Sequence, residues 1–253
     1  MLTLIPGRIA SAVAGLLLGV MLTANAHAMT VEPVVVDLKA AGHGMNQVIA
    51  VENNGSYPLP VELTVQELAL SSDGVHATGK DSGDVVAFPP QASIAPGQTQ
   101  TFRIQYMGDP ALGHSKHYYV TVAQLPVNLP QTPVGINVLY NFQVLVNVGP
   151  PGVRPALRIS AAEIGRSAAG NAVPVLTVTN DSASYGYLSH GQLRLVEKDR
   201  SGHSVLNRVL SGAEIEQAIG LGLIGSGQSR QVMLPLVLPE AEGTVEAQFV
   251  PVK

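Results

Sequence analysis

The sequence predicts an all-β protein of two β-sandwich domains, and three observations carry this prediction. Val-rich, strand-like runs alternate with turn residues throughout residues 29–253, and long runs of helix formers are nearly absent. The chain has 26 Gly and 18 Pro, which favour turns, and only 13% charged residues. A stiff, Pro-rich connector over residues 149–155 separates a first domain, residues 29–148, from a second, residues 156–253.

Residues 1–28 have the pattern of a cleaved secretion signal. Arg8 precedes an apolar run, Ile9–Leu22, that is shorter than the roughly 20 residues a membrane-spanning helix needs. Ala26-His27-Ala28 is the small-residue motif that signal peptidase cleaves. A buried N-terminal helix is the alternative. We expect an exported mature chain that begins near Met29 and has no stable membrane anchor.

The first domain is predicted to contain short strands separated by turns. The turn clusters are Asn53-Asn54-Gly55-Ser56, Ser71-Ser72-Asp73-Gly74 and Ala95-Pro96-Gly97-Gln98. Short strands at such spacing favour a sandwich of Greek-key type. The expected strands are Thr30–Leu38, Gln47–Asn53, Val61–Ala69, Thr99–Tyr106, His117–Gln124 and Val138–Val148.

The second domain repeats this pattern after the connector and adds one helix. Ala213–Ile219 has Ser211 or Gly212 ahead of it, acidic residues in its first turn and Gly220 behind it, which predicts a short helix. The expected strands are Ala156–Ser160, Val173–Asn180, Gly191–Glu197, Ser229–Leu238 and Thr244–Val250.

The run Val138–Val148 is unusually long and regular for a strand. Every even position is apolar and the odd positions are mostly polar, over about twice the length of a typical strand. Two interpretations remain open on pattern alone. The run is a core strand with one solvated face, or an edge strand that offers its apolar side chains to a partner.

Several function classes lack the residues that they require. The chain has no Cys, which removes thiol catalysis, disulfides and thiolate metal sites. It contains no Gly-x-Ser-x-Gly elbow, Walker loop or dinucleotide fingerprint. The net charge of −4 gives no reason to expect nucleic acid. We therefore expect no enzyme, catalytic residue, cofactor, nucleic-acid partner or small-molecule substrate.

His114-x-x-His117 is the one pattern that could suggest a metal site. It leads into a strand-like run, Tyr118–Val122, and side chains three apart on a strand point to opposite faces. One ion would not meet both imidazoles. We therefore expect no metal there.

The order of motifs in the first domain resembles the PapD-like periplasmic chaperones of the chaperone–usher pathway. The motifs are a Pro-Pro step in Val85–Pro90, a Pro-Gly turn in Ile94–Gln98 and an Arg-containing strand at Phe102-Arg103-Ile104. The match continues through Tyr118–Val127 and reaches Asn137-Val138-Leu139. In the second half, Leu176–Asn180 and Gly225–Arg230 fit less specifically. Two further segments, Gln105–Pro110 and Leu125–Leu129, are most similar to the archaic, spore-coat-like branch.

This resemblance implies a boomerang of two immunoglobulin-like sandwiches and favours the edge-strand interpretation of Val138–Val148. In the family, the long G strand of the first domain fills an apolar groove in a pilin subunit that lacks its final strand. The even-numbered side chains are expected to insert, although a bulge could shift their phase. They are Val138, Tyr140, Phe142, Val144 and Val146.

The family also holds the pilin's C-terminal carboxylate between two basic side chains in the interdomain cleft. The usual positions are an Arg on the first strand and a Lys near the end of the G strand, and this sequence has neither. We expect Arg103 and Lys116 to form the anchor, with Lys39 in reserve. Solvated surface charge is the alternative for each.

The resemblance thus implies a periplasmic protein that binds and caps pilin subunits and delivers them to an outer-membrane usher. A structural pilus or surface subunit is the main alternative. A pilin would be one sandwich with a free N-terminal extension, which fits this chain less well. A third alternative, a periplasmic metal-handling or hydrolytic sandwich, lacks ligand clusters.

Overall fold

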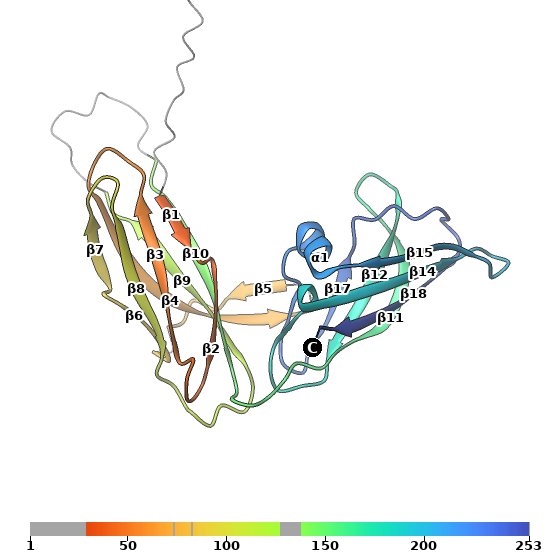
Figure 1. Ribbon diagram of the computed structural model, residues 1–253, viewed down its shortest axis with the longest axis horizontal. Coiled ribbons are helices and arrows are strands. Elements are labelled where there is room, and N and C mark those ends of the chain that lie inside the picture. Colours follow the sequence, from red (N-terminus) through yellow and green to blue (C-terminus); the bar gives the residue numbers. More distant parts are fainter. Residues whose placement is uncertain (1–28, 73, 82, 127–137, 253) are drawn as a thin grey trace, which may run out of the picture.

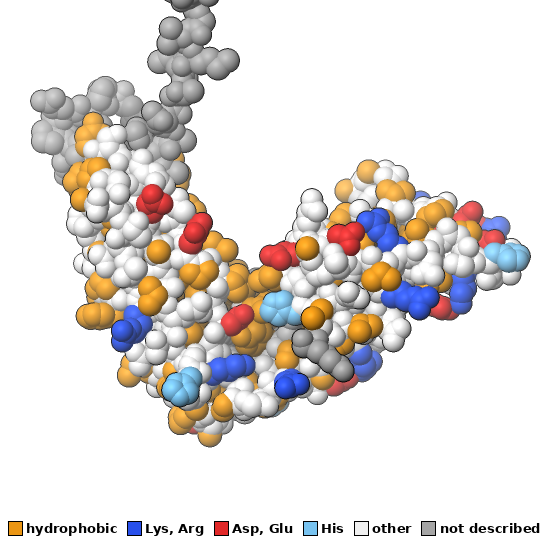
Figure 2. All heavy atoms as spheres, in the orientation of Figure 1, with side chains coloured by type: hydrophobic (Ala, Val, Ile, Leu, Met, Phe, Trp, Pro, Cys, Tyr) orange, Lys and Arg blue, Asp and Glu red, His pale blue; other side chains and the backbone are white. Residues whose placement is uncertain are grey.

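The computed structural model describes residues 29–252 except 73, 82 and 127–137. The expected signal peptide, residues 1–28, therefore lies outside the described residues. The described chain forms two β-sandwich lobes joined at a bend (Figure 1). A space-filling view shows a wide open space between the two lobes (Figure 2). This arrangement confirms the predicted all-β class and the two-domain boomerang.

The N-terminal lobe is built from two facing sheets. One sheet has the strand order β1-β3-β8-β6, and the other β2-β10-β9-β4-β5 with β7 paired to β4. The strands are β1 (Met29–Glu32), β2 (Val35–Lys39), β3 (Asn46–Asn53), β4 (Leu59–Ser71), β5 (Gly74–Ala77), β6 (Val85–Phe88), β7 (Gln91–Ile94), β8 (Thr99–Tyr106), β9 (Lys116–Gln124) and β10 (Asn141–Gly149).

The core of this lobe lies between the two sheets. Alternate residues of β8 and β9, among them Phe102 and Tyr118, are fully buried in it. The alternation that predicted these strands therefore also predicts which face is buried.

The first expected strand, Thr30–Leu38, is divided between the two sheets. Its first half pairs antiparallel with β3, and its second half, from Val35, pairs parallel with β10. Pro33 lies at the break, where a missing N–H would interrupt a continuous ladder. The chain thus switches sheets here, and β2 covers only part of β10.

The C-terminal lobe contains two three-stranded sheets, β11-β12-β17 and β15-β14-β18, and a short β13-β16 pair. Its core includes Leu176, Leu193 and Ile215, all almost fully buried. The strands are β11 (Leu157–Arg166), β12 (Ala172–Asn180), β13 (Gly186–Tyr187), β14 (Gly191–Lys198), β15 (Ser204–Leu210), β16 (Leu223–Ile224), β17 (Ser229–Met233) and β18 (Thr244–Pro251). A 3-10 turn, Leu188–His190, precedes β14.

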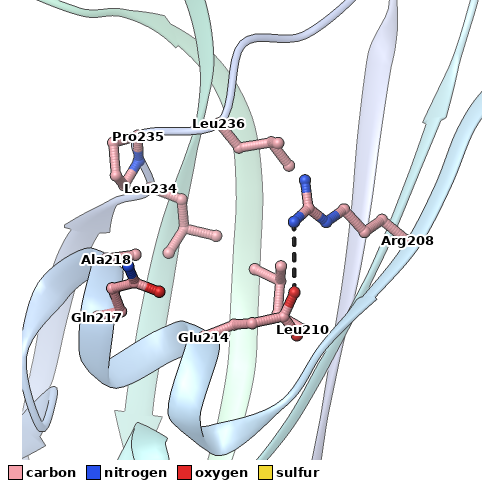
Figure 3. Close-up of a pocket in the computed structure, with 8 residues that line it drawn as sticks. All are labelled: Arg208, Leu210, Glu214, Gln217, Ala218, Leu234, Pro235 and Leu236. Atoms are coloured by element: carbon pink, nitrogen blue, oxygen red, sulfur yellow. Dashed lines mark hydrogen bonds and ion pairs between the residues drawn. The ribbon is translucent and has the colours of Figure 1, made fainter.

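One α-helix, α1 (Gly212–Ile219), lies at an end of this sandwich, close to the predicted Ala213–Ile219. Ser211 and Glu214 form a reciprocal capping box at its start, which satisfies two backbone N–H groups. Beside α1, a small cavity opens between β15 and the segment after β17, with Arg208 lying across it toward Glu214 (Figure 3). In the described part of the chain, no helix is long and apolar enough to cross a membrane.

The β4–β5 hairpin joins the two lobes. It extends from the N-terminal sandwich toward the C-terminal lobe (Figure 1). Leu70 at its end packs near Tyr185 and Leu223, and its carbonyl accepts a hydrogen bond from Gln228 Nε2 at 2.5 Å. The N–H of Ser115 also donates to the carbonyl of Ala183 at 3.0 Å. These contacts position the C-terminal lobe against the end of β10.

Candidate functional site

One edge of β10 is open along half of its length. On one side, β9 pairs with β10 from Asn141 to Val148. On the other side, β2 pairs only from Leu145 to Gly149. The segment Asn141–Val144 therefore has a neighbour on a single side among the described residues.

The hydrogen-bond pattern shows which backbone groups face the open edge. The N–H of Leu145 donates to the carbonyl of Val34 at 2.9 Å, so Leu145 faces the β2 side. The carbonyl of Tyr140 accepts from the N–H of Gln124 at 2.9 Å, so the even residues face β9. Because successive residues of a strand alternate in direction, the N–H and C=O groups of Asn141 and Gln143 face outward. They form a site where another strand can pair.

The side chains of β10 divide differently from the prediction. Val144 and Val146 are 0% exposed and belong to the core of their own lobe. Their predicted insertion into a partner is therefore corrected, because the same apolar face that suggested insertion closes this sandwich. Tyr140 and Phe142 are half-buried against that core.

The segment just before β10 carries the exposed apolar side chains. Val138 is 58% exposed and Leu139 is 46% exposed. Leu139 lies on the odd face, which the sequence did not single out. The exposed apolar surface at this end of β10 thus comes from two adjacent residues, one at an even and one at an odd position.

A hollow of about 510 Å³ lies at the bend between the lobes. On the face seen in Figure 2, basic, acidic and histidine side chains lie at this bend among hydrophobic ones. The hollow is lined from both lobes and from the connector. Its charged lining residues are Asp37 and Lys39 on β2 and Arg154 on the connector.

The two cations of this hollow have no bonded partner among the described residues, since no side-chain hydrogen bond or ion pair involves Lys39 or Arg154. Asp37 is engaged instead with Tyr187, whose hydroxyl donates to Asp37 Oδ1 at 2.6 Å. The ammonium of Lys39 lies beside Gly149, because a Cβ built on that glycine would be 3.7 Å from Lys39 Nζ. The hollow therefore offers two cations to an anionic ligand.

The predicted pair of Arg103 and Lys116 does not line this hollow. Arg103 is exposed on β8, in the sheet that does not contain β10, where its Cα partners are Val48 and Phe88. Lys116 Nζ donates to Asp84 Oδ2 at 2.6 Å, and this hydrogen bond raises the pKa of Lys116. Only the reserve candidate, Lys39, lies in the hollow.

A buried polar network connects β10 to the wall of the hollow. His117 Nδ1 lies 2.6 Å from Asn147 Oδ1, and Asn147 Nδ2 donates to the hydroxyl of Tyr187 at 2.6 Å. Burial lowers the pKa of His117, against the opposing effects of the Asn147 hydrogen bond and the Asp37 charge. Burial also raises the pKa of Tyr187, and nearby Asp37 raises it further. The network thus joins neutral groups to one carboxylate and fixes the lobes relative to each other.

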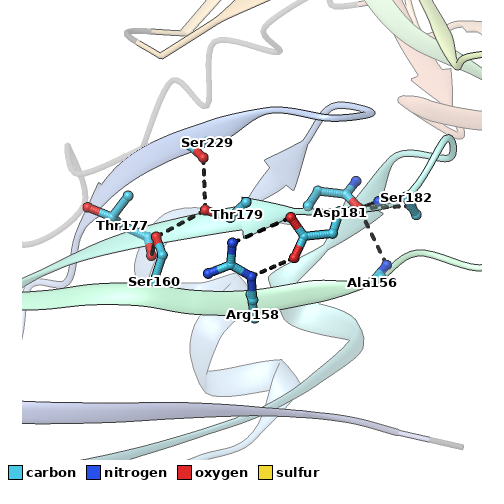
Figure 4. Close-up of polar contacts among 9 residues, drawn as sticks. Ala156, Arg158, Ser160, Thr177, Thr179, Asp181, Ser182 and Ser229 are labelled. Atoms are coloured by element: carbon cyan, nitrogen blue, oxygen red, sulfur yellow. Dashed lines mark hydrogen bonds and ion pairs between the residues drawn. The ribbon is translucent and has the colours of Figure 1, made fainter.

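The connector that carries Arg154 is held against the C-terminal lobe. Gly186 permits the close approach, because a Cβ there would be 2.7 Å from Pro155 Cβ. Arg158 Nε donates to Asp181 Oδ2 at 2.5 Å, and the N–H of Ala156 donates to Asn180 Oδ1 at 3.4 Å (Figure 4). Arg154 thus stands next to a fixed segment of chain.

The histidines of the His114-x-x-His117 pattern make separate contacts. His114 Nδ1 lies 2.8 Å from Ser226 Oγ of the C-terminal lobe, whereas His117 faces Asn147. Within the described residues, no group of three or more potential metal ligands gathers anywhere.

Sequence reasoning missed two residues of this site. Arg154 stands in the predicted connector, and its position between two domains was the signal that could have marked it. Leu139 was set aside because its phase differs from the even face. Both residues were missed because the sequence pattern describes one segment at a time and does not show which segments lie next to it in the fold.

Two solved chaperone structures are similar to this chain over most of its length. The class 5 fimbriae chaperone CfaA is 14% identical, with a TM-score of 0.53 over 89% of this chain and 100% of that one. A chain from a chaperone–tip adhesin complex of CFA/I fimbriae biogenesis is 12% identical, with a TM-score of 0.52 over the same shares.

A third match comes from the CsuC–CsuE chaperone–tip adhesion subunit complex of the archaic Csu pili of Acinetobacter baumannii. It is 11% identical, with a TM-score of 0.48 over 81% of this chain and 89% of that one. No protein-family model matches the sequence, and no curated protein matches it either.

The first two likenesses define the class of the fold. The chain has the fold of a PapD-like pilus chaperone, two immunoglobulin-like domains in a bent arrangement. The resemblance found in the sequence motifs is thereby confirmed for the fold.

Proposed function

We propose that this protein is a periplasmic chaperone that binds and caps pilin subunits during pilus assembly. The observation that carries the proposal is the open edge of β10 at Asn141–Val144, with outward backbone groups and no charged residue. An uncovered strand edge next to exposed apolar side chains, here Val138 and Leu139, is an aggregation hazard unless it has a partner. A pilin that lacks one strand is a partner of matching chemistry. No catalytic residue or cofactor is needed for this function.

In the proposed complex, a pilin strand adds to β10 and bonds to Asn141 and Gln143. Val138, Tyr140 and Phe142 remain the candidates for insertion on the even face. Leu139 is the candidate on the odd face, since it is 46% exposed. Main-chain bonds supply the affinity, and these alternate side chains supply the fit to pockets of the pilin groove.

Lys39 and Arg154 are the proposed anchor for the pilin's C-terminal carboxylate. A guanidinium can hold a carboxylate through two hydrogen bonds, and an ammonium adds a point contact. The position of Lys39 Nζ beside Gly149 supports this role, because it places a cation at the end of β10. The anchor would set the register of the pilin along the open edge.

Delivery to an outer-membrane usher requires a second surface that stays free while the pilin is bound. Val48, Arg103 and Phe88 form a row across β3, β8 and β6, on the sheet that lacks β10. Phe88 is 70% exposed and Val48 is 47% exposed. We assign Arg103 to this outer row and propose the row as the contact with the usher. The archaic-type segments Gln105–Pro110 and Leu125–Leu129 remain the reason to expect the archaic branch.

Co-expression with the pilin encoded beside it tests the proposal. The expected result is a soluble one-to-one complex. Val138→Asp and Leu139→Asp place a charge at an even and at an odd position, and both variants are expected to stay folded because both positions are exposed. The face that inserts is the one whose charge abolishes the complex. If neither variant reduces the yield of complex, the open edge of β10 is not the binding site.

A structural pilus subunit is the alternative function. The same co-expression distinguishes it, because a subunit would enter the assembled fibre, whereas a chaperone stays in the soluble fraction. Recovery of the chain from sheared pili would contradict the proposal.

A further inference from the structure

The hollow at the bend is larger than a carboxylate anchor requires. Its volume of about 510 Å³ lies within the roughly 300–1,000 Å³ typical of sites that enclose a whole small ligand. Much of its remaining wall is apolar and comes from the C-terminal lobe and the connector. The apolar lining residues include Pro155, Leu157, Phe249, Pro251 and Val252.

We propose that this apolar wall binds the last side chain of the captured polypeptide, and that the site selects chains ending in a large apolar residue. The inference rests on the proposed function, because it takes Lys39 and Arg154 as the anchor of the terminal carboxylate. A carboxylate held by these cations places the side chain of the same residue within one short step of the wall. The site would thus recognise the terminal carboxylate and the apolar side chain of the same residue together.

The wall has a fixed shape. Leu157 and Phe249 pack in part against the core of the C-terminal lobe. The N–H of Val252 donates to the carbonyl of His190 at 3.1 Å, which holds Val252 beside the hollow. Val252 itself is 68% exposed, so apolar surface remains uncovered there in the free protein. A ligand that covers it removes this surface from water.

The charges of the hollow also discriminate between termini. Asp37 lines the same hollow, and its carboxylate disfavours a second acidic group nearby because like charges repel. A terminal Asp would therefore meet repulsion, and a terminal Ser would gain nothing from the apolar wall. A terminal Leu or Phe gains the burial of its side chain.

Short peptides and the full-length protein test the selection. Hexapeptides of Gly and Ser that end in Leu, Phe, Ser or Asp are titrated by NMR, together with an amidated Leu peptide. The expected result is binding by the Leu and Phe peptides about tenfold tighter than by the Ser peptide, with amidation removing most of it. The same substitutions at the last residue of the co-expressed pilin provide a second test, in which the yield of complex is measured.

A matched pair of variants locates the selection on the wall. Val252→Asp is expected to abolish the preference for Leu over Ser while the requirement for a free carboxylate persists. Val250→Asp makes the same change on β18 at a residue 47% exposed that does not line the hollow, and is expected to have no effect.

The possible failures are distinguishable. Equal capture of pilins ending in Leu and Ser, or a preference that survives Val252→Asp, overturns the inference and leaves the chaperone function intact. Failure of the wild-type protein to capture any pilin overturns the proposed function itself.

Discussion

Two sheet edges of this molecule differ in how they are protected. In the C-terminal lobe, β15 is an edge strand, and alternate residues along it are Leu206, Arg208 and Leu210, of which Leu210 is buried and Arg208 is exposed. Arg208 lies across the cavity of about 280 Å³ beside α1, and its Nη2 is 3.4 Å from Glu214 Oε1. In the N-terminal lobe, the open stretch of β10 has no charged residue.

The presence of a charge on one edge and its absence on the other indicate which edge can accept an additional strand. A charge on an edge strand disfavours the addition of another strand, because the added strand would remove the charge from water. β15 has such a charge, and β10 does not. The edge of β15 thus carries a charge that opposes strand addition, whereas the open stretch of β10, the proposed binding edge, carries none.

Closing the open edge of β10 is expected to have the largest effect. Gln143→Pro removes an N–H that faces outward and leaves the even residues bonded to β9. Capture of the pilin is expected to fall by more than about tenfold, since both the lost bond and the ring oppose strand addition. Yield of the co-expressed complex is the measurement, and Gln143→Ala is the matched control that keeps the N–H. Equal yields from the two variants would contradict the pairing.

Removing the cations at the bend is expected to have the next largest effect. Lys39→Gln and Arg154→Gln should each weaken pilin binding by about tenfold, because a partly solvated charge-assisted contact is lost. Arg103→Ala is the informative comparison, since Arg103 lies on the other sheet and should leave capture unchanged. Loss of capture with Arg103→Ala alone would return the anchor to the pair that the sequence suggested.

Removing the charge on β15 should make the edge of β15 resemble the open edge of β10. With Arg208→Val, β15 loses its one charged residue, and self-association is expected at lower protein concentration. Light scattering across a concentration series measures this. Arg194→Val makes the same change on the central strand β14 and should have little effect. A variant at Arg208 that stays monomeric would show that another feature protects this edge.

The smallest expected effect concerns pH and the network behind β10. Because burial lowers the pKa of His117 from its ordinary 6.5, the unfolded chain takes up the proton first as the pH falls. The free energy of unfolding should therefore decrease below about pH 6.5 and show no contribution from this group above it. His117→Gln should flatten this part of the curve measured by urea unfolding. If the pH dependence of the free energy of unfolding were unchanged in this variant, protonation of His117 would not contribute to stability.

Much of the fold follows from the sequence because alternation and turn residues are local signals. The predicted strands from Gln47–Asn53 to Thr244–Val250 all have counterparts, and α1 differs from the prediction by one residue. The division of Thr30–Leu38 was missed, although Pro33 within it was a signal. The short strands β5 and β13 have too few residues for a period to be recognised.

The site was less predictable because it depends on which surfaces meet. The sequence predicted the apolar even face of β10. However, alternation of apolar and polar residues does not distinguish side chains that enter the domain's own core from side chains that enter a partner's groove. Val144 and Val146 therefore appeared equivalent to Val138 and Phe142. Arg154 gains its position only from the bend between the lobes.

Amide hydrogen exchange of β10 tests the central claim most directly. In the free protein, the N–H groups of Asn141 and Gln143 should exchange quickly, whereas those of Phe142 and Val144, which face β9, should be protected. In the complex with pilin, Asn141 and Gln143 should become protected as well. If both amides still exchange quickly while the pilin is bound, the open edge of β10 does not receive the pilin strand.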